Sequence, residues 1–251
     1  MKIVLVILTI VAFAFTLFVN YLAGSGQLND VGTGELSALY TTLFTPAGFT
    51  FSIWGIIYLL NTVFCGLQLY KLVKSPETIN SKHILVFILV CLLNVAWLCT
   101  WHYKLLSISV VVMLLMLSSL VYGVIESRKK RMTSKGNYFE YINFSVYLGW
   151  ISVATIANVS AWLHTLEVGV NFQIPFTIAM IAIATLLAMW FSHKLRNYAF
   201  GMVVIWALFG IHKAQKIQSP DGYNLIALIS LLGMTLIVLS IARRWSKKMV
   251  R

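Results

Sequence analysis

The chain has 251 residues, of which 60% are hydrophobic and only 10% are charged, and it carries a net charge of +12. An ordinary soluble domain carries about 25% charged residues, so these few charges could not cover a water-exposed surface of this size. Lipid must therefore be part of the solvent. The positive charge does not indicate nucleic-acid binding, because the basic residues form short clusters between long uncharged stretches and no soluble basic domain is present.

Apolar segments long enough to cross a bilayer follow one another along the whole chain. A helix needs about 20 mostly apolar residues to cross ~30 Å of hydrocarbon. Suitable segments lie at residues 3–23, 49–70, 83–102, 105–125, 141–163, 173–192, 197–212 and 223–242. The segment 197–212 is the shortest, and its length also fits a re-entrant or buried helix. We predict an all-α integral membrane protein with eight spans.

The first apolar segment could also be a signal peptide, because Ala23, Gly24 and Ser25 behind it are small enough for a cleavage site. Its apolar run of about 20 residues is longer than the 7–15 residues of a typical signal-peptide core. We interpret it as the first membrane helix.

The distribution of Lys and Arg predicts the orientation of the chain. With the N-terminus inside and eight spans, 16 of the 19 basic residues fall inside, and only Lys104, Lys213 and Lys216 fall outside. This bias follows the positive-inside rule, so we predict that both termini are inside. It also supports the span 197–212, since the C-terminal basic cluster would otherwise lie outside. A bacterial cytoplasmic membrane is our default location.

The longest predicted external loop, about 24–48, carries Asp30 and Glu35 and no basic residue. It is rich in Gly, Ser and Thr, so we expect a polar loop that is partly ordered against the helical bundle.

Residues suited to catalysis or metal binding are scarce. No predicted span has Asp, Glu, Lys or Arg near its centre, a pattern that disfavours an ion-driven transporter. The histidines, at 83, 102, 164, 193 and 212, stand singly near span ends, where an interfacial role is commoner than metal binding. The three cysteines lie in apolar stretches and form no CxxC pair. We therefore expect no enzyme activity, no metal site and no covalently bound cofactor.

Aromatic and amide side chains concentrate on one face of three predicted spans. These faces hold Trp54, Tyr58 and Asn61 in the second span, Asn94, Trp97 and Trp101 in the third, and Tyr147, Trp150, Ala154, Asn158 and Trp162 in the fifth. Steps of three, four or seven place residues on one side of a helix. A bundle lined in this way suits a flat, largely hydrophobic ligand with a polar edge. The spacing alone also fits an interfacial aromatic belt or ordinary helix packing, and packing is the commoner outcome.

The three segments resemble the translocator protein family, TspO, also called the tryptophan-rich sensory proteins. Ile53-Trp54 and Tyr58 match the Val-Trp and Tyr of the family's second helix, and Leu93-Asn94-Val95-Ala96-Trp97 matches the Leu-Asn-x-Ala-Trp of its third helix. The most specific match is in the fifth helix, where Tyr147, Trp150, Thr155, Asn158 and Trp162 keep the family's spacing. The chain departs from the family at Val146 and Ala47, where the family has proline.

The resemblance covers about residues 1–165 and implies a five-helix domain there, followed by a three-helix C-terminal extension at 166–251. It implies binding of a tetrapyrrole such as a porphyrin or haem, or of a sterol-like lipid, in a pocket enclosed by the five helices and the first loop. It assigns Trp150 and Asn158 to that pocket, with Trp97 and Trp54 beside them. The full set of expected ligand-binding residues is Trp54, Tyr58, Asn94, Trp97, Tyr147, Trp150, Ala154 and Asn158.

The leading hypothesis is a membrane receptor or sensor for a hydrophobic small molecule, with a tetrapyrrole as the first candidate. The alternative is a small-solute permease, because the chain has eight predicted spans with polar residues in several of them. An intramembrane enzyme has the least support, since no acid–base pair is visible. The expected partners are the small molecule and membrane lipid, with no nucleic acid. Dimers are common in the TspO family, and small residues such as Ser145 and Gly149 could support a homodimer.

Overall fold

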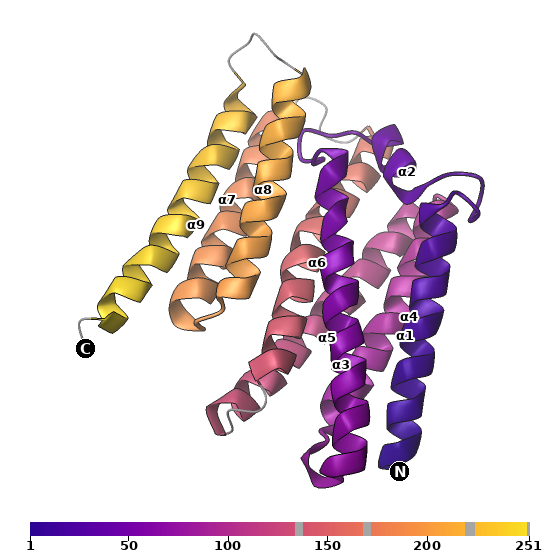
Figure 1. The fold of residues 1–251 in the computed structure, drawn as a ribbon. Helices are drawn as coiled ribbons and strands as arrows, with labels where there is room; N and C mark the ends of the chain where they lie inside the picture. Colours follow the sequence, from indigo (N-terminus) through magenta and orange to yellow (C-terminus); the bar gives the residue numbers. More distant parts are fainter. Residues whose placement is uncertain (134–137, 168–171, 219–223, 250–251) are drawn as a thin grey trace. The chain divides into compact units, whose positions relative to one another are not determined.

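The computed structural model describes residues 1–133, 138–167, 172–218 and 224–249 of the chain. Within these ranges every regular element is a helix, as predicted (Figure 1). The α-helices are α1 (Lys2–Gly24), α2 (Thr33–Leu39), α3 (Ile53–Lys74), α4 (Ser81–His102), α5 (Leu106–Thr133), α6 (Tyr138–Thr165), α7 (Gln173–Lys194), α8 (Tyr198–Gln218) and α9 (Leu225–Met249). Two short 3-10 helices, η1 (Gly48–Ser52) and η2 (Pro76–Thr78), stand before and after α3.

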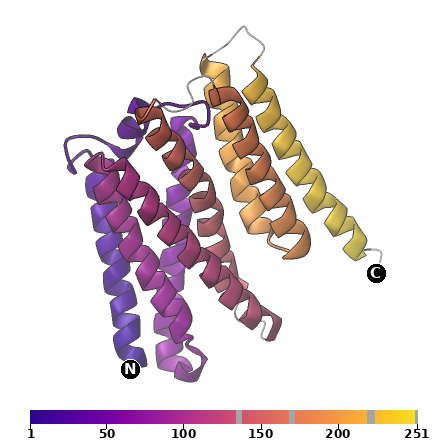
Figure 2. The same ribbon diagram turned by 180° about the vertical axis from the view of Figure 1, so that it is seen from behind.

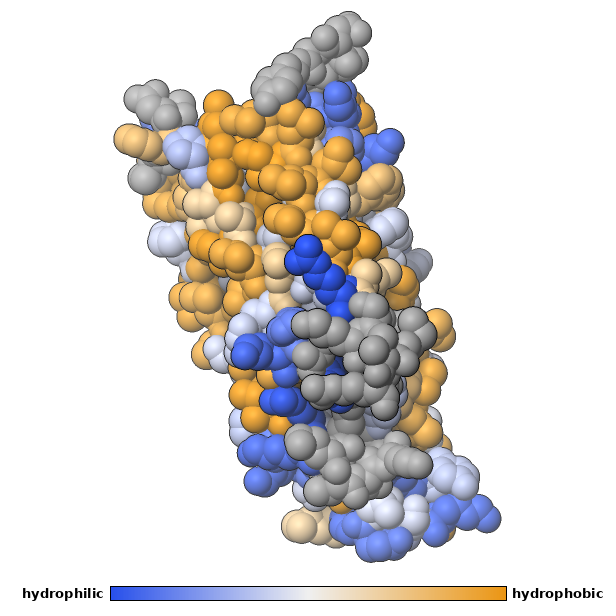
Figure 3. Space-filling model, turned by 90° about the vertical axis from the view of Figure 1, so that its left-hand side faces the viewer, coloured by the Kyte–Doolittle hydropathy of each residue, from blue (hydrophilic) through white to orange (hydrophobic). Residues whose placement is uncertain are grey.

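Seven helices of the described chain are long and apolar enough to cross a membrane. They are α1, α3 together with η1, α4, α5, α6, α7 and α9. Many of their large apolar side chains are exposed, among them Leu59, Leu186 and Leu232, as expected for helices that face lipid. Figure 3 shows the broad hydrophobic areas that result. These findings confirm a helical integral membrane protein.

The eighth predicted span is also a helix, but it differs from the others. The segment predicted at 197–212 forms α8, which continues to Gln218 and is not among the seven apolar candidates. Its last turns carry His212, Lys213 and Lys216, which lower its mean hydropathy. Its buried residues include Gly201, Ala207 and Gly210, whose small side chains allow neighbouring helices to approach closely.

The described helices fall into two compact units, and the first consists of residues 1–36 and 53–148. In this unit α4 packs against both α1 and α5, and α1 also packs against α3. Phe64 of α3 stacks on Phe87 of α4 with ring centroids 4.5 Å apart, and its ring also meets Phe144 of α6 edge-on. The core of the first unit is therefore apolar and aromatic at the level where α3, α4 and α6 meet.

Helix α1 is an integral helix of the first unit, as predicted for the N-terminal segment. The Thr16 hydroxyl donates to the Cys91 carbonyl at 3.2 Å, and the Asn20 carboxamide donates to the Asn94 side chain at 2.8 Å. Both bonds run from α1 to α4. Polar contacts of this kind fix the neighbours of a helix within a membrane, where apolar packing alone discriminates little.

The second unit consists of residues 37–52 and 149–251 and contains η1 and α7, α8 and α9. The three helices pack against one another in all pairs (Figure 2). Phe191 of α7 stacks on Phe200 of α8 with ring centroids 4.3 Å apart. A Cβ at Gly233 of α9 would come within 2.6 Å of Thr185 Oγ1 of α7, so these helices approach closely because Gly233 has no side chain.

Helix α6 contributes to both units, because the division between them falls between Leu148 and Gly149. The predicted domains, 1–165 and 166–251, were divided where the TspO-like motifs end. This division stays a prediction. Gly149 lies against α8, where an added Cβ would stand 3.0 Å from Val203 Cβ. The homodimer suggested by Ser145 and Gly149 also stays a prediction, although Gly149 already packs within the chain.

Candidate functional site

Five of the eight predicted ligand-binding residues form one cluster in the first unit, which we call the aromatic–amide cluster. It consists of Trp54 and Tyr58 of α3, Asn94 and Trp97 of α4, and Tyr147 of α6. Trp54 stands at its centre. Its ring lies 5.6 Å from Tyr58 and 6.1 Å from Trp97, and it meets Tyr147 edge-on at 5.8 Å. The structure therefore brings together residues that the sequence places on three separate helices.

The two indole rings of the cluster and the Trp101 ring, which follows them on α4, lie nearly parallel. The planes of Trp54 and Trp97 differ by 25°, and those of Trp97 and Trp101 differ by 24° at a centroid distance of 6.2 Å. Helical spacing explains the second pair, because Trp97 and Trp101 are one turn apart on α4. Centroid distances of this size are those of offset aromatic stacking. The result is a row of three indoles.

A chain of hydrogen bonds runs through the same cluster and connects five helices. The Tyr58 hydroxyl donates to the Asn20 side-chain oxygen, and the Asn20 amide donates to Asn94 Oδ1 at 2.8 Å. The Asn94 amide donates to the Tyr147 hydroxyl at 3.1 Å, and that hydroxyl donates to Met116 Sδ at 3.9 Å. Asn94 is fully buried, so these partners supply the hydrogen bonds that lipid cannot.

Sequence reasoning missed two members of this chain, Asn20 and Met116. The signal for Asn20 was present, because it is an amide inside the first predicted span, but nothing in the spacing shows which helix it faces. Met116 carries no such signal, since methionine is an ordinary apolar residue of a membrane helix.

The other three predicted residues, Trp150, Ala154 and Asn158, lie in the second unit. They continue the stripe along α6 at the predicted spacing. Trp150 is only 2% exposed and meets Phe51, in η1, edge-on at 5.9 Å. Asn158 is also buried, whereas Ala154 is partly exposed. The segment that follows the first loop therefore contributes an aromatic contact to Trp150, and the assignment of these three residues to a ligand pocket stays a prediction.

A second polar cluster lies in the first unit, around Glu140, and was not predicted. The Glu140 carboxylate accepts hydrogen bonds from Lys71 Nζ at 2.6 Å, from Gln68 Nε2 at 3.1 Å and from the His83 imidazole. The predicted fifth span began at residue 141, but α6 begins at Tyr138 and buries Glu140 in its first turn. A carboxylate is favoured there because it faces the positive end of the helix dipole.

The His83 side chain illustrates why this cluster was missed. A lone histidine near a span end was expected to be interfacial, yet His83 is only 1% exposed and shares the carboxylate of Glu140. The pairing depends on the contact between α4 and α6, which the sequence does not encode locally. Through Glu140, Lys71 and His83, the C-terminal end of α3 is bonded to the N-terminal ends of α4 and α6.

The first loop is ordered within both units, as predicted. In the first unit, the Asn29 amide donates to the His102 carbonyl at 2.7 Å, and the His102 ring bonds the Thr33 hydroxyl and the Leu28 carbonyl, both at 2.9 Å. His102 is fully buried, so it supports the start of the loop rather than standing exposed at the end of α4.

The later part of the loop is held by α8 within the second unit. Ala47 N–H donates to the Gly210 carbonyl at 3.0 Å, the Trp206 indole donates to the Thr50 carbonyl at 2.9 Å, and Gln215 Nε2 donates to the Leu43 carbonyl at 3.1 Å. Gly210 permits this approach, because a Cβ there would stand only 2.9 Å from the Thr50 Cβ. Helix α8 therefore holds residues 43–50 in place through these hydrogen bonds.

Comparison with known protein families shows which family the chain belongs to. The family model described as TSPO-like protein matches residues 6–243. The chain belongs to the TSPO-like protein family. The match includes α7, α8 and most of α9, so it extends well past residue 165, where the recognisable TspO motifs end. No curated protein and no solved structure matches the chain.

In this TSPO-like chain, the family motifs correspond to the structural features just described. Trp54, Asn94 and Trp97 belong to the aromatic–amide cluster, and Trp150 is the buried ring against Phe51. Among the residues that the structure describes, no group of three or more His, Cys, Asp or Glu is placed to hold a metal ion. The chemistry that this arrangement offers is aromatic stacking and neutral hydrogen bonding.

Proposed function

We propose that this protein is a membrane receptor that binds a flat hydrophobic small molecule, with a tetrapyrrole such as protoporphyrin or haem as the leading candidate and a sterol-like lipid as the second. The role is binding, without a catalysed reaction. The single observation that carries the proposal is the row of nearly parallel indoles, Trp54, Trp97 and Trp101, joined to a buried chain of amides and phenols.

Flat aromatic faces and neutral polar groups suit this class of ligand. A planar ring system gains dispersion and stacking energy against indole rings, and each aromatic pair contributes about 0.5–1.5 kcal/mol beyond burial. Trp54 and Tyr58 are partly exposed, so a molecule can reach them while the bundle stays folded. Asn94 and Tyr147 can exchange their internal bonds for bonds to polar groups at the ligand edge.

The test is a titration of detergent-purified protein with protoporphyrin IX, followed by quenching of tryptophan fluorescence. We expect saturable quenching, and we expect Trp97→Phe to weaken binding roughly threefold to tenfold because a smaller ring stacks less well. Trp150→Phe and Asn158→Ala extend the test to the α6 residues that the family resemblance assigns.

Trp190→Phe is the matched control, since Trp190 of α7 is 51% exposed and lies outside the aromatic–amide cluster. It should leave the affinity unchanged while removing one fluorophore. Quenching that rises without saturation, or equal affinity in the wild type and all cluster variants, would overturn the proposal.

The small-solute permease is separated from the receptor by a transport measurement. Proteoliposomes that contain the purified protein are assayed for uptake of protoporphyrin IX and of a panel of small polar solutes. A receptor binds the porphyrin but accumulates none of the solutes. Uptake that depends on the protein and saturates with solute would favour the permease instead.

A further inference from the structure

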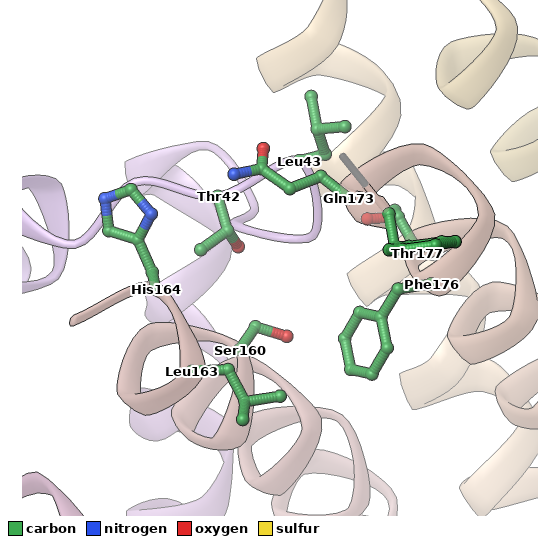
Figure 4. Close-up of a pocket in the computed structure, with 9 residues that line it drawn as sticks. Thr42, Leu43, Ser160, Leu163, His164, Gln173, Phe176 and Thr177 are labelled. Carbon is green, nitrogen blue, oxygen red and sulfur yellow. The ribbon is translucent and has the colours of Figure 1, made fainter. Parts of the chain in front are cut away.

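A cavity of about 290 Å³ lies within the second unit, and its lining includes no residue of the aromatic–amide cluster. Three segments line it: Thr42 and Leu43 of the first loop, Ser160 and Leu163 near the end of α6, and Gln173 and Phe176 at the start of α7 (Figure 4). Ser160 and Leu163 share one face of α6, and Gln173 and Phe176 share one face of α7, because the residues of each pair are three apart. We refer to this space as the loop cavity.

The loop wall of the cavity is held in place. The Thr45 hydroxyl accepts a hydrogen bond from Thr42 N–H at 2.9 Å, and Thr45 N–H donates to the Thr42 carbonyl at 3.0 Å. The neighbouring Leu43 carbonyl is bonded to Gln215 of α8. Ligand sites in proteins are usually largely pre-formed, and these hydrogen bonds give the loop wall the fixed backbone that such a site needs.

The lining combines apolar surface with a few neutral polar groups. Leu43, Leu163 and Phe176 provide apolar walls, while Figure 4 shows the Gln173 carboxamide extending toward Thr42. The Ser160 hydroxyl donates to the Ile156 carbonyl at 2.8 Å, which leaves its oxygen able to accept. Among the described lining residues the one ionisable side chain is His164, so the cavity suits a neutral molecule.

The size of the cavity limits the ligand. An apolar protein cavity of about 150 Å³ accommodates benzene, so about twice that volume accommodates two fused rings. Ligand pockets for larger molecules extend up to about 1,000 Å³, and a tetrapyrrole with four pyrrole rings would need a space nearer to that range. The loop cavity therefore takes a different ligand from the one proposed for the receptor site.

We propose that the loop cavity is a second binding site, which takes a small neutral compound of two fused aromatic rings with a hydrogen-bonding edge. The apolar walls bury the rings, and Gln173 or Ser160 pairs with the polar edge. Both α7 and the part of the loop fastened by α8 belong to the lining, so the site needs the C-terminal helices. It does not depend on tetrapyrrole binding elsewhere in the chain.

The test uses fluoroindole as a probe, because indole has two fused rings and one N–H donor. Full-length protein in lipid nanodiscs is titrated and followed by fluorine NMR, with protein-free nanodiscs as the reference for partition into lipid. We expect a saturable shift with the protein. Leu163→Trp should abolish it by filling the cavity, and Gln173→Leu should weaken binding roughly threefold to tenfold through loss of one hydrogen bond.

Two matched controls separate the cavity from general effects. Leu166→Trp places the same ring on a residue that is 52% exposed and not part of the lining, and Gln218→Leu makes the same change at the exposed end of α8. Both should bind fluoroindole like the wild type. A shift identical in protein-free nanodiscs, or unchanged affinity in Gln173→Leu, would overturn the second site. Because Gln173→Leu alters one polar group at similar volume, it tests the site even if Leu163→Trp does not fold.

Discussion

The Glu140 carboxylate lies 2.6 Å from the Lys71 ammonium, and this ion pair connects α6 to α3 inside the first unit. Both partners are largely shielded from solvent, and His83 occupies the second carboxylate oxygen. The carboxylate is thus the common acceptor for side chains from two other helices. Its removal would leave Lys71 and His83 without the acceptor that compensates their burial.

We therefore predict that Glu140→Leu destabilises the protein by about 3–5 kcal/mol, the usual cost of breaking a buried ion pair by removing one partner. Thermal or denaturant unfolding in detergent measures the change. The matched control is Glu126→Leu, which removes the ion pair between Glu126 and Lys129 one turn apart on α5. The Lys129 side chain is 67% exposed, so solvent screens this pair and its loss should have little effect. Equal stability of the two variants would contradict the assigned role of Glu140.

The bond between Asn94 and Tyr147 predicts a measurable coupling between α4 and α6. In a double-mutant cycle with Asn94→Ala and Tyr147→Phe, we expect a coupling energy of about 0.6 kcal/mol and at most about 1.7 kcal/mol, as found for hydrogen bonds between membrane helices. The coupling energy is calculated from the unfolding free energies of the wild type, the two single variants and the double variant. A coupling of zero would mean that the two side chains do not interact in the folded protein.

Gly210 and Gly66 should respond in opposite directions to the same substitution. Gly210→Ala places a methyl group against Thr50 of the loop, so we expect a loss of stability and faster proteolysis within residues 37–52. Gly66 lies in α3 with open space around its Cβ position. Gly66→Ala should stabilise the helix by up to about 1 kcal/mol, because alanine is the better helix former. Two variants of equal stability would contradict the close approach of η1 to α8.

The orientation predicted from basic residues can be tested by labelling single cysteines in whole cells. The native cysteines are first replaced, and cysteine is then introduced at Gln27 or at Glu77, both of which are exposed. We expect an impermeant maleimide to label the Gln27→Cys protein from outside. The Glu77→Cys protein should stay unlabelled until the cells are permeabilised. The reverse pattern would place the N-terminus outside.

Helix positions could be predicted because a membrane imposes one requirement, about 20 apolar residues in a row. The ends of the helices were less predictable. Helix α5 was expected to stop at 125 but continues to Thr133, because charged residues end a membrane segment without ending a helix. In the same way, α6 starts three residues before the predicted span and brings Glu140 into the protein interior.

The candidate site was predictable in part, since five aromatic and amide residues of the family motifs do meet in one cluster. Their partners Asn20 and Met116 could not be predicted, because contacts between helices depend on how the helices rotate about their axes and which ones are neighbours. The loop cavity was beyond prediction for the same reason. Its lining comes from a loop and two helices whose spacing in the sequence carries no common pattern.

The hydrogen bond from Ala47 N–H to the Gly210 carbonyl has a consequence for biosynthesis. At about 5–20 residues per second, the ribosome adds Gly210 roughly 8–30 s after Ala47. During that interval the loop segment 37–52 has emerged, but the helix that accepts its backbone bond does not exist. A nascent chain that is halted after α6 would carry residues 37–52 without α8. A truncation that removes α8 would therefore impair a segment near the N-terminus.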